Sequence, residues 1–325
     1  MRQLFFVVML VLTQLARIDN AKAEQYPSRP ITIVVPAAPG GPTDTIARIL
    51  AERMTASLGA AIVIENNGAA AGSVGVGRVA RASPDGYTIG IGHVGTHVFN
   101  GAIYTLQYDL LADFEPIAEV ASNPQLIVAK KAFPAENLKE FTAWLKANPD
   151  VAFQGTAGVG SPGHIAGFYF QTRTGTHFGF VPYRGAAPTM QALLGGQVDL
   201  LFDQAANSLP QVKAGQIKAF AVTAKTRLAT APDIPTVDEA GLPGFYTAIW
   251  HGLWAPKGTP REVITRLNSS VMDALADAKV QQRLAQLGQE LPPREQQTPE
   301  GLAALQKAEI EKWWPIIKAA NIKVE

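Results

Sequence analysis

The chain has 325 residues, of which 47% are hydrophobic, and its formal net charge is +1. A nearly neutral chain without a basic tract is poorly suited to nucleic acid or to an anionic membrane surface, so we expect neither as a partner. The sequence contains no cysteine, which excludes disulfides, thiolate metal sites and a lipid anchor on an N-terminal cysteine.

Residues 1–23 are predicted to be a signal peptide. Arg2 supplies a positive start, an apolar run follows from Leu4 to Leu12, and Ala21-Lys22-Ala23 fits a small-x-small cleavage site. The apolar run is much shorter than the roughly 20 residues that a membrane-spanning helix needs. We therefore expect cleavage near Ala23 and export of a soluble protein.

Residues 24–124 alternate strand-like and helix-like segments, which predicts a parallel sheet with helices on both faces. We assign them to the first part of lobe 1. Runs of β-branched residues and helical spacing of apolar residues predict strands at 31–35, 62–65 and 88–91, and helices at 43–58 and 72–82.

Residues 125–225 are predicted to form lobe 2, and residues 226–325 a linker and the second part of lobe 1. The fold class is therefore α/β with two lobes, each a mostly parallel sheet flanked by helices. The predicted strands of these parts are 126–129, 151–154, 178–182, 198–202, 217–223 and 249–255, and the helices are 138–146, 163–174, 186–194, 205–213, about 261–287 and about 299–320.

The stretch from Pro36 to Asp44 joins the first predicted strand to the first predicted helix. Gly40 and Gly41 allow a ligand to approach the backbone closely, and free N–H groups at the start of a helix attract anions. We expect Thr43 or Asp44 to cap this helix. An ordinary strand-to-helix turn fits the same residues equally well, so the spacing alone leaves both interpretations open.

Two other glycine-rich loops, Gly90–Gly95 and Gly158–Gly163, fit the pattern G-x-G-x-x-G. Neither follows the first predicted strand, as a dinucleotide-binding loop does, so we predict no dinucleotide cofactor. Glycine-rich turns nevertheless expose runs of backbone N–H groups that bind anions. One such loop in each lobe suggests a small anion clamped between the lobes.

A metal site or a hydrolytic nucleophile is not favoured. His93 and His97 have the spacing of zinc ligands on a helix, but Gly92 and Gly95 disfavour a helix and no Glu follows His93. We expect His97 to line a cleft as a loop histidine. Ser161 lacks the first glycine of a nucleophile elbow, so we interpret it as a helix cap or a hydroxyl donor to a ligand.

Four further residues could take part in the site, and three of them have a second interpretation. Asp203 ends a predicted strand and either orients a ligand group or caps the next helix. Arg184 could pair with a carboxylate, although a solvated surface position is the simpler interpretation. Trp250 and His251 could form an apolar wall of the site, and core packing is the alternative for Trp250.

Motifs along the whole chain point to a known family. They are Y-P-S-R-P-I-T-I-V-V-P at 26–36, P-G-G-P-T-D at 39–44, P-D-G-Y-T at 84–88, V-P-Y-R-G at 181–185, G-G-Q-V-D-L-L-F-D at 195–203, A-V-T at 221–223, P-T-V-D-E-A-G at 235–241 and A-P-K-G-T-P at 255–260. This set resembles the Bug family, the extracytoplasmic solute receptors of tripartite tricarboxylate transporters.

The resemblance implies a fold similar to type II periplasmic binding proteins, a periplasmic location and no enzymatic activity. It implies a small carboxylate ligand, delivery to the membrane permease subunits of a tripartite tricarboxylate transporter, and no cofactor; we expect a monomer. The family positions for ligand binding fall on Gly40, Gly41, Asp44, Thr96, Thr156, Ala157, Gly158, Ser161, His164 and Asp203.

One departure from the family pattern concerns Ala37, where members commonly carry an aromatic residue near the ligand. A smaller side chain would widen the pocket, with Phe99, Tyr104 and Trp250 nearby. A wider pocket suits a bulkier acid, such as an aromatic or dicarboxylic acid of the size of terephthalate.

Two other functions share some of these features. A periplasmic ligand sensor would have the same fold and pocket and would feed a signalling partner instead of a permease. A periplasmic hydrolase would need a nucleophile–base pair or a metal, for which the residues give little support.

Overall fold

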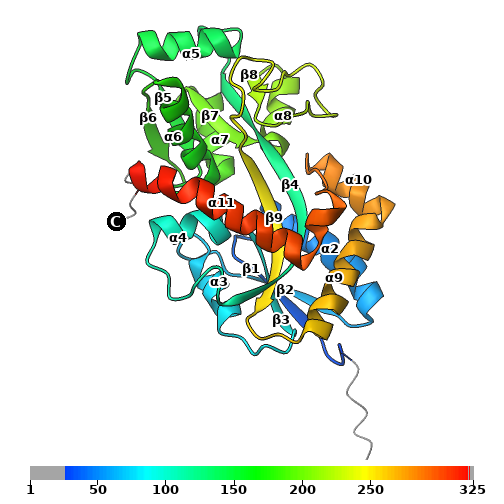
Figure 1. Cartoon of the computed structure of the whole chain (residues 1–325). Helices are drawn as coiled ribbons and strands as arrows, with labels where there is room; N and C mark the ends of the chain where they lie inside the picture. The colour runs from blue at the N-terminus through cyan, green and yellow to red at the C-terminus, as the bar shows by residue number, and fades with distance from the viewer. Residues whose placement is uncertain (1–25, 321, 323–325) are drawn as a thin grey trace, which may run out of the picture.

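The computed structural model describes residues 26–320 and residue 322, so the predicted signal peptide lies outside the described residues. Two α/β parts are stacked along the long axis of the molecule, and the C-terminal helix lies across the boundary between them (Figure 1). Within residues 26–320, no helix combines the length and the apolarity that a membrane crossing requires.

The first lobe is built on three parallel strands that pack against helices. Strand β1 (Ile31–Val35) lies between β2 (Ile62–Asn66) and β3 (Thr88–His93). Ile31, Ile33 and Val35 are buried against the apolar face of α2 (Pro42–Leu58). The other helical segments of this part are α3 (Ser73–Ala80), the π-helical turn η1 (Gly95–Phe99) and α4 (Asn100–Ile103).

The second lobe repeats the arrangement around β5 (Phe153–Thr156), which pairs in parallel with β6 (Gly179–Pro182) and β7 (Leu200–Gln204). Its core is rich in aromatic rings; Phe141 and Phe220 have ring centroids 4.7 Å apart, and Phe170 meets Phe245 edge-on at 5.7 Å. The elements are α5 (Leu138–Ala147), β5 (Phe153–Thr156), α6 (Pro162–Thr174), β6 (Gly179–Pro182), α7 (Ala186–Leu194), β7 (Leu200–Gln204), α8 (Ala205–Lys213) and β8 (Ile217–Val222).

Two long strands, β4 (Phe114–Lys130) and β9 (Ala248–Pro256), cross between the lobes. The first part of β4 pairs with β9, and its last residues pair with β7 and β8, so that one sheet runs in the order β2-β1-β3-β9-β4-β7-β5-β6. At the crossing, the buried Asn123 accepts a hydrogen bond from the N–H of Ala205 (3.0 Å) and donates one to the carbonyl of Gly288. The predicted parallel pairings are present, and these two strands add antiparallel ones.

The two largest errors in the predicted element bounds concern β4 and the helix predicted at 261–287. The predicted strand at 126–129 is the end of the 17-residue β4. The predicted helix at 261–287 is two helices, α9 (Arg261–Ala276) and α10 (Ala278–Gln286), because Asp277 is extended and its carboxylate accepts hydrogen bonds from the N–H groups of Lys279 and Val280.

Helix α11 (Pro299–Ala319), preceded by the short 3₁₀ turn η2 (Arg294–Gln297), contacts both lobes. Trp254 of the first lobe donates to Gln306 at 3.1 Å, and the ring of Trp313 meets Tyr169 of α6 edge-on at 5.2 Å. This helix therefore joins the lobes in addition to the two crossing strands (Figure 1).

Candidate functional site

The first predicted turn connects β1 to α2. Helix α2 begins at Pro42 and its N-cap is Gly41, so the prediction that Thr43 or Asp44 caps the helix was wrong. Proline is favoured at the first helical position because its φ is preset and its missing N–H would be unpaired there. Gly41 has no side chain to cap the helix, which leaves backbone N–H groups at the start of α2 without a side-chain acceptor from the cap.

The side chain of Asp44 holds this turn in place through hydrogen bonds. Its carboxylate is buried and accepts hydrogen bonds from the Gly40 N–H (2.8 Å), Arg48 Nε (2.9 Å) and Asn66 Nδ2 (2.9 Å). Burial acts to raise the pKa of Asp44, but the hydrogen bonds from Arg48, Gly40 and Asn66 outweigh it and hold the pKa below its usual value. Because its oxygens are engaged by these donors, Asp44 positions the turn.

The second predicted turn connects β5 to α6. Ser161 is the N-cap of α6 and its hydroxyl accepts from the N–H of His164 (3.4 Å), as predicted for a helix cap. The N–H of Gly160 donates to Nδ1 of His164 at 3.0 Å. At the end of β5, the hydroxyl of Thr156 is buried and has no hydrogen-bond partner among the residues that the structure describes.

The two turns share one backbone design. In each, a left-handed glycine (Gly40, φ 79°; Gly160, φ 76°) precedes the N-cap, and a proline occupies the first helical position. Four residues after the glycine, a side chain on the first helical turn accepts the glycine N–H. The acceptor is Asp44 in the first turn and His164 in the second.

A third segment lies at the end of β3. The Thr96 hydroxyl accepts from the N–H of His93 (3.0 Å) and donates to its carbonyl (3.1 Å), and it lies 3.0 Å from Nδ1 of His97. The ring of His93 accepts the N–H of Gly95 through Nδ1 at 3.0 Å. These bonds fix His93 and Thr96 at the carboxyl end of the strand, where ligands of parallel α/β sheets bind.

The antiparallel pairing of β3 with β9 places His93 opposite His251, with ring centroids 5.7 Å apart. His251 lies 3.2 Å from the hydroxyl of Thr43, through Nε2. The first turn is thus connected to the end of β3 by side-chain contacts. Sequence reasoning considered His251 only as part of an apolar wall and interpreted His93 only as a loop histidine, because the pairing that joins them links strands far apart in the chain.

The glycine-rich loops of the two lobes meet at this point. A Cβ built on Gly95 would lie 3.7 Å from Cδ of Pro162, the first residue of α6, and one built on Gly160 would lie 2.8 Å from Cδ1 of Ile103. Glycine at position 160 therefore permits the close approach of the lobes as well as the left-handed turn.

Burial keeps the histidines of this region uncharged. It lowers the pKa of His93 and of His164 to about 4. The pKa of His97 falls to about 3, through burial and, secondarily, the neighbouring His93. These three imidazoles are neutral at pH 7.

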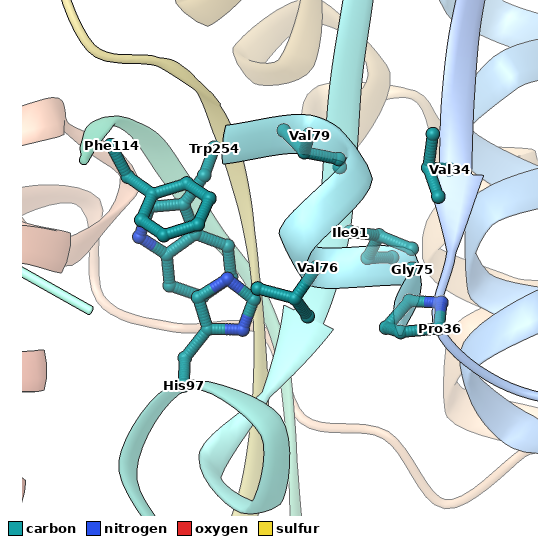
Figure 2. A pocket seen from close by; sticks show the side chains of 10 residues that line it. Val34, Pro36, Gly75, Val76, Val79, Ile91, His97, Phe114 and Trp254 are labelled. Carbon is teal, nitrogen blue, oxygen red and sulfur yellow. The ribbon is translucent and has the colours of Figure 1, made fainter. Parts of the chain in front are cut away.

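His97 lies below the surface of the site. Figure 2 shows its ring stacked on Trp254, with centroids 3.7 Å apart, and beside Phe114, next to a cavity of about 10 Å³. His93 ends β3 whereas His97 belongs to η1, so the two do not share a helical face. Within residues 26–320, no cluster of His, Asp and Glu side chains has the arrangement of a metal site.

The remaining predicted residues are spread around this centre. Asp203, at the end of β7, accepts from Ser208 (2.6 Å) and Asn207 (2.8 Å), and burial raises its pKa to about 6. Trp250 is 3% exposed in the core and its Nε1 lies 3.4 Å from Glu309. Ala37 is half-buried, Ala157 is exposed and Arg184 is exposed. The structure thus brings the two turns near His93, and it buries Trp250 in a core cluster that also contains Ile165 of α6.

Comparison with known proteins agrees with this architecture. Residues 46–322 match the family model described as tripartite tricarboxylate transporter family receptor, TctC. The chain is 43% identical to the periplasmic binding protein BugD, with a TM-score of 0.81 over 92% of this chain and 100% of that one.

Two further solved structures are similar and were obtained with ligands. MatC from Rhodopseudomonas palustris with bound malate is 40% identical, with a TM-score of 0.81 over 90% of this chain and 100% of that one. An R. palustris protein with adipate is 35% identical, with a TM-score of 0.83 over 92% and 100%. These relatives are substrate-binding proteins and not enzymes. The chain therefore belongs to the TctC receptor family of tripartite tricarboxylate transporters, the Bug family of periplasmic solute-binding proteins.

Proposed function

We propose that this protein captures a small carboxylate between its two lobes in the periplasm and delivers it to the permease subunits of a tripartite tricarboxylate transporter. The observation that carries the proposal is the matched pair of turns, one in each lobe, built on Gly40 and Gly160. Each places the start of a helix at the carboxyl end of a strand, and helix starts bind carboxylates. The malate and adipate bound by two relatives support the same ligand class.

In this proposal the ligand contacts come from both turns and from the end of β3. Backbone N–H groups, hydroxyls and the side chain of His164 make the contacts, and Asp44 positions the first turn without touching the ligand. Thr156 contributes the buried hydroxyl that has no partner among the described residues. The contacting residues are Gly40, Gly41, Thr96, Thr156, Ala157, Gly158, Ser161 and His164, with Ala37 and Asp203 at the margin.

We propose that binding proceeds by closure of the lobes. The ligand first contacts one lobe, and the glycine-rich loop of the other lobe then completes its set of donors. The short distance between Gly160 and Ile103 supports this step, because the loops of the two lobes can approach to contact.

The size of the ligand depends in this proposal on Ala37. Its methyl group leaves room that an aromatic side chain would fill, so acids as bulky as terephthalate are included with C4 to C6 dicarboxylates. An Ala37→Phe variant should lose affinity for terephthalate by tenfold or more while keeping malate. Equal affinity of both proteins for terephthalate would contradict this assignment of the pocket.

The main test is a thermal-shift and calorimetric screen of the protein from residue 24 onward. The panel holds malate, succinate, adipate, citrate and terephthalate, each beside its uncharged amide as a matched control. A ligand at 100 times its Kd should stabilise the folded state by about 2.7 kcal/mol. We expect stabilisation by at least one acid and by none of the amides. Equal effects of an acid and its amide would contradict carboxylate recognition.

Transport is tested in the producing cell. Deletion of the gene should abolish uptake of the labelled acid while expression of genes induced by that acid continues. Normal uptake with lost induction would instead identify the protein as a sensor.

A further inference from the structure

We infer that His93 and His164 form a pair of imidazole donors, one on each lobe, that determine affinity by giving their Nε2–H groups to the ligand carboxylate. The inference rests on the proposed function; it adds the side chain of His93 to the site and assigns the contact of His164 to its Nε2–H group. It starts from the hydrogen bonds that each ring already makes.

Each ring is fixed in one tautomer by a glycine. Nδ1 of His93 accepts the N–H of Gly95, and Nδ1 of His164 accepts the N–H of Gly160, both at 3.0 Å. A neutral imidazole has one N–H, and a nitrogen that accepts a hydrogen bond does not carry it. The proton of each neutral ring therefore resides on Nε2, which makes Nε2 a donor in both lobes.

Neither Nε2 is used inside the protein. Among the described residues, no hydrogen bond involves Nε2 of His93 or of His164. Neither atom belongs to the buried polar atoms that lack a partner, although both residues are largely buried. Each Nε2 atom therefore keeps some accessible area, and we assign these two N–H groups as donors to the ligand carboxylate.

The two rings flank the place where the lobes meet. His93 is next to Gly95, and the Cβ position of Gly95 is 3.7 Å from Pro162, two residues before His164. Phe168 and Phe180 hold the ring of His164 edge-on at 5.0 and 4.7 Å, and His251 holds His93 at 5.7 Å. Both donors are therefore held in fixed orientations, which reduces the entropy lost when a ligand binds.

The chemistry suits reversible capture of an anion. Burial keeps both imidazoles uncharged at neutral pH, so they offer N–H donors without placing a cation in the site. A hydrogen bond from a neutral donor to a carboxylate is stronger than a bond between neutral groups. Such a hydrogen bond lacks the full attraction of an ion pair. An ion pair would slow release of the ligand to a permease.

Two substitutions at each position separate a donor from a structural role. Asn can accept the glycine N–H through Oδ1 and lacks the Nε2 donor, whereas Gln can place an N–H near the Nε2 position but cannot keep the same bond to glycine. We would make His93→Asn, His93→Gln, His164→Asn and His164→Gln, and measure Kd by calorimetry with whichever of malate, adipate and terephthalate the unaltered protein binds most tightly.

If the rings are donors, each Asn variant should bind roughly tenfold to a hundredfold more weakly, the range expected for loss of a hydrogen bond to a charged group. Each Gln variant should retain most of the affinity. If the rings only support their loops, the Asn variants should bind like the unaltered protein and the Gln variants should be weaker.

His177→Asn is the matched control, because His177 is exposed in the loop between α6 and β6 and should bind with unchanged Kd. Circular dichroism and thermal unfolding of every variant confirm that the folded state is compared. Carboxylate binding that is equal in the unaltered protein and in both Asn variants would overturn the inference and leave the proposed function standing. Absence of carboxylate binding by the unaltered protein would overturn both.

Discussion

In the first-lobe turn, the acceptor beneath the left-handed glycine is the carboxylate of Asp44, whereas in the second-lobe turn it is the imidazole of His164. Asp44 collects three donors and remains ionised. His164 accepts one glycine N–H and remains neutral. The same backbone turn is therefore held by charge in one lobe and by an uncharged ring in the other, and the uncharged ring keeps a free donor.

The largest expected effect comes from removing the charge of the first turn. Asp44→Asn keeps the shape of the side chain but removes its charge and replaces one acceptor oxygen by an NH₂ group that faces the donors Arg48 and Asn66. We therefore expect the free energy of unfolding to fall by about 3 kcal/mol. His164→Asn keeps its one acceptor and loses ring packing, which should cost about 1 kcal/mol. Urea unfolding of both variants measures the difference. An equal or larger loss of stability for His164→Asn would contradict the conclusion that charge stabilises the first turn more than the uncharged ring stabilises the second.

The two turns should also respond to acid at different pH values. The pKa of His164 is about 4 in the folded protein and about 6.5 when unfolded, so between these values the unfolded state binds a proton that the folded state does not. The contribution of His164 to the free energy of unfolding is therefore complete above pH 6.5 and is lost as the pH falls toward 4. Asp44 has a lowered pKa, so its contribution is lost below its unfolded value of 3.8.

We therefore expect the stability difference between the unaltered protein and His164→Asn to decrease by about 2 kcal/mol from pH 7 to pH 5. The difference for Asp44→Asn should stay constant over this range, because that carboxyl is ionised in both states. Urea titrations at pH 7, 6 and 5 provide the values. A constant difference for His164→Asn would show that its folded pKa is not lowered.

A smaller loss of stability is expected from removing the N-cap side chain of α6. Ser161 caps α6 with its hydroxyl, so Ser161→Ala should lower the free energy of unfolding by about 1 kcal/mol. Unfolding by urea at pH 7 gives the value, and Ser161→Thr, which keeps the hydroxyl, serves as the control. Equal stability of the Ala variant and the unaltered protein would show that the cap bond contributes nothing.

The smallest expected effect is at the uncapped helix. Gly41 has φ −77° and ψ 170°, which a serine adopts without strain, and its Cβ would lie 3.5 Å from the carbonyl of Ala38. Gly41→Ser should add a few tenths of a kcal/mol, equivalent to a rise in Tm of about 1 °C. The same hydroxyl would occupy N–H groups at the start of α2, beside the proposed ligand position, so carboxylate affinity should fall. A stabilised variant with unchanged affinity would remove these N–H groups from the site.

Much of the fold followed from local patterns. Strand β1 and helices α7 and α8 have the predicted bounds, because runs of β-branched residues and apolar helical spacing identify such segments without tertiary information. The first half of β4 was missed because Pro116, Glu119 and Asn123 interrupt any strand-like pattern. Those residues are tolerated in the strand through two irregularities in its pairing with β9.

The two turns of the candidate site were predicted as turns from the sequence, and the side-chain contacts between them were not. Glycine spacing identified both loops, and the resemblance to the Bug family supplied Thr156 and His164. The contact of His93 with His251 depends on a cross-strand register, and the choice of Nδ1 as acceptor depends on the position of Gly95 in space. Neither property is encoded in local spacing, because each arises when distant segments pair.

The crossing strands have a mechanical consequence. Because β4 and β9 stay hydrogen-bonded through the crossing and Asn123 ties it to Ala205 and Gly288, the lobes are not joined by a freely jointed linker. A change in the angle between the lobes would therefore twist both β4 and β9 along their paired length. In the lobe closure that we propose, twisting these strands would cost free energy that is returned on opening, which would favour release of the ligand.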